Sequence, residues 1–105
     1  MKMEGLWRTH FCLGDAQGDG LAVLRDGEVL GGDPAHTYTG SYTSDGPELY
    51  LDVRVSPNAG HVPADMDRPL HFVLWGSVSG DSGNLHGSAD NEPKLKVTVD
   101  LHRAA

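Results

Sequence analysis

Cysteine, long apolar runs and basic side chains are all scarce in this chain of 105 residues. The single cysteine, Cys12, excludes an intramolecular disulfide and a thiolate metal cluster within one chain, and it is typical of a reduced, intracellular setting. No run of about 18 apolar residues occurs that could span a membrane, and the first residues lack the apolar core of a signal peptide. We therefore expect a cytoplasmic protein with a single domain over residues 1–105.

Basic residues are too few and too scattered to form a nucleic-acid-binding surface. The chain has eight Lys and Arg against fifteen Asp and Glu, which gives a net charge of −7 at pH 7. Such a surface repels phosphate backbones, and it also keeps a small protein soluble without any partner. We expect no direct nucleic-acid or membrane binding, and any charged partner is expected to be basic.

Helical periodicity is absent as well, and what remains is the pattern of short β-strands. Alternating apolar and polar residues predict strands at residues 6–13, 21–25, 28–30, 36–43, 48–55, 70–79, 84–88 and 94–101. Asp26-Gly27, between the second and third strands, is a strong signal for a type I′ hairpin turn. The cluster Gly31-Gly32-Asp33-Pro34 is expected to end the third strand.

Two segments are predicted to be irregular. Residues 14–20 contain three glycines in seven positions and are predicted to be a loop. Residues 56–69 contain three prolines and form the longest predicted connection, with one helical turn expected around 63–67.

Eight antiparallel strands joined by turns are typical of an all-β, eight-stranded up-and-down β-barrel, with an open β-sandwich as the alternative. A barrel of this size is either filled by side chains or holds one small ligand. The residues expected to face inward are Trp7, Phe11, Leu13, Leu21, Val23, Tyr38, Tyr42, Leu49, Leu51, Val53, Leu95, Val97 and Val99, with Leu70 or Val73 and with Phe72 or Trp75. The strand at 70–79 is apolar on both faces, so we expect its outer face to form a homodimer interface.

The sequence shows no evident set of catalytic or metal-binding residues. None of the six histidines has metal-ligand spacing (His10, His36, His61, His71, His86 and His102). Asp15 and Asp19 lack the ligand order of a calcium loop, and residues 79–83 join two predicted strands instead of forming a nucleophile elbow. Cys12 is interpreted as a small buried or half-buried thiol. We therefore expect no catalytic residues, metal or cofactor, and no enzymatic activity.

A family resemblance adds a functional expectation. Gly5-Leu6-Trp7, the hairpin from Gly20 to Leu30, Gly31-Gly32-Asp33, and Tyr38-Thr39-Gly40 followed by Leu49-Tyr50-Leu51-Asp52-Val53 resemble, in order and spacing, the GrlR family of negative regulators of type III secretion. The resemblance covers the first half of the chain, and the second half agrees only in its strand pattern. It implies a bacterial, cytoplasmic, lipocalin-like barrel that forms homodimers and sequesters a helix-turn-helix transcription activator.

The resemblance also implies where the partner binds. In that family an acidic loop after the Tyr-x-Gly strand is implicated in the contact, and the matching turn here is Thr43-Ser44-Asp45-Gly46-Pro47-Glu48. Asp45 and Glu48 are therefore the implied partner-binding residues, in a thinner cluster than the family has.

An alternative function follows from the aromatic residues. A barrel interior lined by aromatic side chains can hold a small apolar or amphipathic ligand. The residues that would line such a site are Trp7, Phe11, Tyr38, Tyr42, Phe72 and Trp75. A packed core without a ligand explains the same residues.

Overall fold

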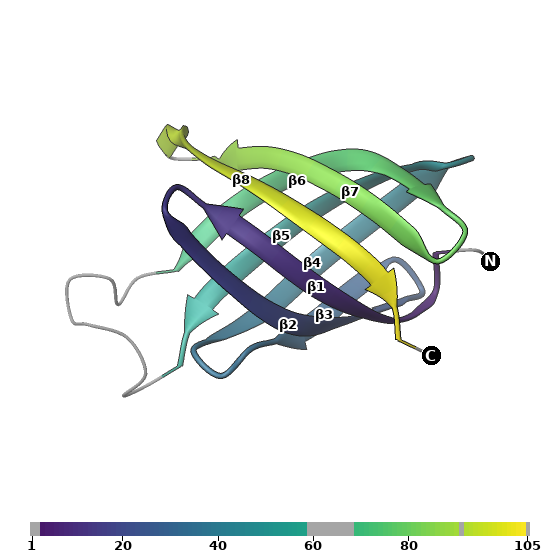
Figure 1. Ribbon diagram of the computed structural model, residues 1–105, viewed down its shortest axis with the longest axis horizontal. Coiled ribbons are helices and arrows are strands. Elements are labelled where there is room, and N and C mark those ends of the chain that lie inside the picture. Colours follow the sequence, from purple (N-terminus) through teal and green to yellow (C-terminus); the bar gives the residue numbers. More distant parts are fainter. Residues whose placement is uncertain (1–2, 59–68, 91, 105) are drawn as a thin grey trace.

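The computed structural model describes residues 3–58, 69–90 and 92–104, which form a closed β-barrel (Figure 1). Its antiparallel strands are β1 (Gly5–Leu13), β2 (Ala16–Arg25), β3 (Glu28–Gly32), β4 (His36–Asp45), β5 (Glu48–Pro57), β6 (Leu70–Ser79), β7 (Ser82–Ala89) and β8 (Glu92–Arg103). Each strand pairs with the next in sequence, and β8 returns to pair with β1. The predicted eight-stranded up-and-down barrel is confirmed, and closure leaves no open sheet edge.

Tight turns join the strands where glycine or Asp-Gly was expected to turn the chain. Asp26 and Gly27 both have positive φ, 52° and 81°, as a type I′ hairpin turn requires. Gly46 and Gly80 also have positive φ, 60° and 63°, in the β4–β5 and β6–β7 turns. In the part of the chain that the structure describes, no helix has the length and apolar character needed to cross a membrane.

The loop predicted over residues 14–20 is wrong beyond Asp15, because β2 begins at Ala16. Gly18 and Gly20 lie within this strand beside aromatic side chains from other strands. A Cβ atom on Gly18 would lie 2.5 Å from Cζ of Phe11, and one on Gly20 would lie 2.8 Å from the hydroxyl oxygen of Tyr38. These glycines therefore make room for rings and do not interrupt the strand.

The third strand continues through the two glycines that were expected to end it, and the turn begins at Asp33. The Oδ1 atom of Asp33 accepts hydrogen bonds from the backbone N–H groups of Ala35 and His36, both at 2.8 Å. Its Oδ2 atom accepts a hydrogen bond from the Tyr38 hydroxyl. The side chain of Asp33 thus fixes the β3–β4 turn. The helical turn predicted around 63–67 lies outside the described residues.

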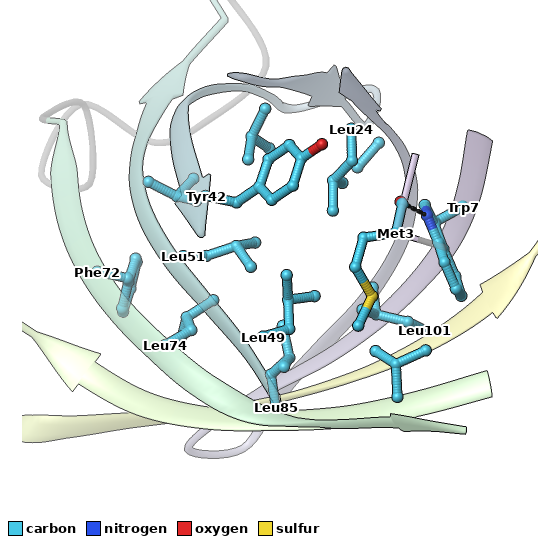
Figure 2. Packing of buried hydrophobic residues seen from close by; sticks show 14 of the residues in the cluster. Met3, Trp7, Leu24, Tyr42, Leu49, Leu51, Phe72, Leu74, Leu85 and Leu101 are labelled. Atoms are coloured by element: carbon cyan, nitrogen blue, oxygen red, sulfur yellow. Dashed lines mark hydrogen bonds between the residues drawn. The ribbon is translucent and has the colours of Figure 1, made fainter. Parts of the chain in front are cut away.

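The hydrophobic core lies inside the barrel (Figure 2) and extends from Met3 and Trp7, at the end of the barrel that holds both termini (Figure 1), to Phe72 and Ala89. Trp7, Leu49 and Leu85 have no exposed surface there. The segment before β1 folds back on this core, and the Trp7 Nε1–H donates a hydrogen bond of 2.9 Å to the carbonyl oxygen of Met3. The Arg103 guanidinium lies 4.2 Å from the centre of the Trp7 ring. Contacts from both ends of the chain therefore cover the core at this end.

In β2 the inner and outer faces are the reverse of the prediction. Leu21 and Val23 were expected inside but are 48% and 39% exposed, and Ala22 and Leu24 are buried in their place. Ala22 is the cross-strand partner of Trp7, so the smallest side chain of this apolar run lies beside the largest side chain of the core. In β6, Phe72 and Leu74 are buried while Val73 and Trp75 face outward, which resolves the alternatives left open by the sequence.

Candidate functional site

Three large apolar side chains are exposed together on the outside of β5 and β6. Tyr50, Val73 and Trp75 are 48%, 43% and 44% exposed, and we call them the aromatic face. Tyr50 and Trp75 are directly opposed across the two strands. The Trp75 ring meets the ring of His86 on β7 edge-on, with 4.7 Å between ring centres. Exposed, ordered Trp and Tyr side chains are the kind that dominate protein–protein interfaces.

Carboxylates lie at one border of the aromatic face. Asp45 and Glu48 are paired at the tip of the β4–β5 hairpin, and Glu48 shares the outer face of β5 with Tyr50. The Oε2 atom of Glu48 accepts a hydrogen bond of 2.8 Å from the Ser77 hydroxyl on β6, two residues beyond Trp75. Among the described residues neither Asp45 nor Glu48 forms an ion pair. The structure thus places the two implied partner-binding residues next to the exposed aromatic residues.

More carboxylates reach the same end of the barrel than the sequence order indicates. The β2–β3, β4–β5 and β6–β7 turns all lie at the end that holds both termini (Figure 1). They bring Asp26 and Asp81 to the same end as Asp45 and Glu48. Asp26 lies 3.7 Å from Nε of Arg25, and Asp81 lies 3.3 Å from Nε of Arg103, so basic groups partly balance these two. The signal that could have revealed this arrangement is an acidic residue in or beside every second hairpin turn.

A histidine bridges two carboxylates at the other border of the aromatic face. His71 Nε2 pairs with Asp52, and His71 Nδ1 lies 3.3 Å from Oδ2 of Asp90. The hydrogen bond to Asp52 is the main cause that raises the pKa of His71, against a smaller lowering effect of burial, and Asp90 adds to the rise. The sequence analysis missed this cluster, because its members come from β5, β6 and the β7–β8 turn.

A groove of about 590 Å³ lies beside this histidine. Its lining includes Thr39, Asp52, Arg54, Leu70, His71 and Asp90. Both ring nitrogens of His71 are engaged by carboxylates, those of Asp52 and Asp90. No three His, Cys, Asp or Glu side chains within residues 3–58, 69–90 and 92–104 are placed to hold a metal ion. The cluster ties β5, β6 and the β7–β8 turn together on the outer surface.

The six aromatic residues predicted to line an interior ligand site lie in different environments in the structure. Trp7, Tyr42 and Phe72 are buried in the packed core (Figure 2). Phe11 and Tyr38 pack against that core and are partly buried. Trp75 corrects the prediction, since it points outward while Phe72 fills the interior from the same strand. Whether any ligand enters the barrel stays a prediction.

Tyr38 is held by the turn residue Asp33. Burial is the main cause that raises the pKa of Tyr38, and the hydrogen bond that it donates to Asp33 raises it further. The hydroxyl therefore stays protonated at physiological pH and acts as a hydrogen-bond donor. Its role in this structure is to hold the start of β4 to the β3–β4 turn.

The fold is a closed antiparallel β-barrel of eight strands. No protein-family model matches this chain, and no curated protein matches it either. No family is therefore identified for this chain, and the resemblance described in the sequence stays a prediction.

Proposed function

We propose that this chain is a non-catalytic, GrlR-like regulatory protein that binds a basic DNA-binding protein and keeps it from DNA. The observation that carries the proposal is the position of Asp45 and Glu48 beside the aromatic face of Tyr50, Val73 and Trp75. The resemblance to the GrlR family supplies the partner class, a helix-turn-helix transcription activator.

The chemistry of this surface fits such a partner. Large rings that become buried at an interface supply most of its binding energy, while carboxylates around them attract a basic partner and disfavour acidic ones. A DNA-binding protein carries Lys and Arg where it contacts phosphates. An acidic, aromatic surface that covers those side chains competes directly with DNA, which is how a sequestering regulator acts.

The barrel interior supports protein binding over the alternative of a small ligand. Trp7 and Phe72, two of the six aromatic residues considered for a ligand site, pack against other core side chains (Figure 2). Trp75 lies outside. Phe11 and Tyr38 are partly buried, so the large aromatic side chains with the greatest exposure are Tyr50 and Trp75 on the outer face of β5 and β6.

The proposal is tested by capture from a native bacterial lysate on the tagged full chain, followed by native mass spectrometry of the eluate. We expect one basic DNA-binding protein at a defined stoichiometry. Its recovery should fall about tenfold or more with Trp75→Ser, the loss expected for one interface hot spot. Glu48→Lys should also reduce recovery, whereas Asp15→Lys should not, because Asp15 lies in the β1–β2 turn at the opposite end of the barrel.

A second measurement distinguishes sequestration from mere association. The captured protein is bound to labelled duplex DNA, and fluorescence anisotropy is followed as the barrel protein is added. Wild type should release the DNA, and Trp75→Ser should not. The absence of a stoichiometric basic protein, equal recovery by wild type and Trp75→Ser, or an unchanged anisotropy would each overturn the proposed function.

A further inference from the structure

The single cysteine of the chain lies on the outer surface of the barrel, on β1. Thr9 is buried, so the residues on either side of it in the alternation, His10 and Cys12 among them, point outward. Cys12 is partly buried in this position. Its cross-strand partners, Gln17 on β2 and Thr98 on β8, carry no charge. The titratable group that contacts the thiol comes from β1 itself.

That group is the imidazole of His10, two residues before the cysteine. The Nε2 atom of His10 lies 3.9 Å from the Sγ atom of Cys12. A nucleophile and its base often lie at such a distance when no substrate is bound. The imidazole is therefore placed to take the proton of the thiol.

The second ring nitrogen of His10 is held by a carboxylate on the neighbouring strand. His10 Nδ1 lies 2.8 Å from Oδ1 of Asp19, its cross-strand partner on β2. Asp100 is the partner of His10 on β8, but its Oδ1 atom accepts a hydrogen bond of 2.6 Å from the Asn84 side chain. Asp19 thus orients the ring, because a proton held on Nδ1 leaves Nε2 as the acceptor that faces the sulfur.

The order of these groups is thiol, imidazole, carboxylate. It differs from the His71 cluster, in which both ring nitrogens are engaged by carboxylates. A base on one side of the thiol and a carboxylate behind that base form the arrangement that activates a cysteine as a nucleophile. We propose that Cys12 is a reactive thiol that exchanges with small-molecule disulfides, with His10 as its base and Asp19 as the positioning residue.

The exchange balances with the disulfide as the only co-reactant. His10 Nε2 takes the proton of the Cys12 thiol, and the thiolate attacks one sulfur of the disulfide. A new bond forms between Sγ and that sulfur while the original disulfide bond breaks. The second sulfur leaves with the electron pair of the broken bond and receives the proton from His10. Cys12 is oxidised to a mixed disulfide, and the departing half of the reagent is reduced to a thiol.

The reactive thiol is separate from the partner-binding surface proposed above. In the barrel β1 is paired with β2 and β8, whereas the aromatic face lies on β5 and β6. No residue is shared between the two sites. Failure of one proposal therefore leaves the other unaffected.

The reaction is measured on the full chain, in which every thiol adduct is an adduct of Cys12. The protein is mixed at pH 7 with excess bis(2-hydroxyethyl) disulfide, a neutral reagent, and intact-protein mass spectrometry follows the adduct with time. The same reaction in urea gives the rate of the thiol without its neighbours. Since a free thiol is only a few per cent ionised at this pH, the folded protein should react about tenfold faster than the unfolded chain.

Substitutions assign the roles of the two neighbours. His10→Gln should lower the rate of the folded protein about tenfold, because the base is lost. Asp19→Asn should lower the rate about threefold or more, and Asp19→Glu should restore most of it, because the carboxylate returns. His102→Gln is the control, since the strand partner of His102 on β1 is Arg8, and its rate should equal that of wild type. Circular dichroism confirms that each variant folds.

Three results would overturn the proposal. The first is a folded wild type that reacts no faster than the unfolded chain, as a thiol that is merely shielded would. The second is a folded His10→Gln that reacts as fast as wild type. The third is an Asp19→Glu variant that stays as slow as Asp19→Asn, which would remove Asp19 as the positioning residue.

Discussion

The two tryptophans of this chain provide a stability test in which one residue is the control for the other. Trp7 has no exposed surface, and its ring nitrogen donates to the Met3 carbonyl oxygen at 2.9 Å. Trp75 is 44% exposed on the outside of the barrel. We therefore expect Trp7→Phe to be strongly destabilising and Trp75→Phe to be nearly neutral, although the chemical change is identical.

The magnitude for Trp7 follows from its contacts. Loss of the donor leaves the Met3 carbonyl without its partner, at a cost of about 1–3 kcal/mol. The smaller ring leaves a void that adds about 1 kcal/mol, and the weakened contact with the Arg103 guanidinium adds about 0.5 kcal/mol. Trp7→Phe should therefore lower the free energy of unfolding by about 2.5–4.5 kcal/mol, or roughly 10–20 °C in Tm. Trp75→Phe should stay within about 0.5 kcal/mol of wild type.

Urea unfolding followed by circular dichroism gives the free energies, and fluorescence gives the environment of the tryptophan that remains. In Trp75→Phe the emission comes from buried Trp7, and it should be blue-shifted and protected from acrylamide. In Trp7→Phe it comes from Trp75, and it should be red-shifted and readily quenched. Equal stability costs for the two variants, or a Trp7 that acrylamide quenches as fast as Trp75, would refute the assignment of inner and outer faces.

Two further predictions concern a strand glycine and the bridged histidine. A Cβ atom on Gly40 would lie 1.9 Å from the carbonyl oxygen of Asp52, so Gly40→Ala should cost about 1–3 kcal/mol in urea unfolding, while Ser41→Ala, on the exposed side of the same strand, should be neutral. Because Asp52 raises the pKa of His71 above its ordinary 6.5, protonation of His71 favours the folded state. The stability that wild type has over His71→Gln should be fully present below pH 6.5 and fall as the pH rises through the raised pKa. A difference that is flat or grows over that range would contradict the bridge.

The number and order of the strands could be read from the sequence because turn chemistry is local. Asp26-Gly27 determines its own turn through positive φ values, whatever the rest of the chain does. The glycines of the β1–β2 region could not be read in this way. Gly18 and Gly20 look like loop residues, but they are required by the rings of Phe11 and Tyr38, which belong to other strands. A glycine required by packing and a glycine required by a turn look alike in the local sequence. They differ only in the residues that contact them, and those residues are distant along the chain.

The inner and outer faces were predictable only where a strand alternates. In β5, Leu49, Leu51 and Val53 are all buried, as the alternation predicts. The run from Leu21 to Leu24 is apolar at every position, so its own pattern favours neither face. The neighbouring strand β1 determines which residues of this run face the interior. Trp7 lies opposite Ala22, so Ala22 faces the interior, and Leu21 and Val23 face the outside.

The candidate site could be predicted only in part from the sequence. Asp45 and Glu48 stood out through a family resemblance, and the two-sided apolar character of β6 led to the prediction that its outer face forms a homodimer interface. What the sequence did not show is that Tyr50 and Trp75 are opposed across two strands beside these carboxylates. That relation depends on the register between β5 and β6, which pairs residues 25 positions apart and follows a connection that has no strand pattern of its own.

Closure of the barrel limits how any partner can bind. Because every strand is paired on both sides, a partner cannot add a strand to an open edge, and it must dock on outward side chains. Trp75→Ser, on the outer face of β6, should therefore reduce capture of the basic partner about tenfold or more.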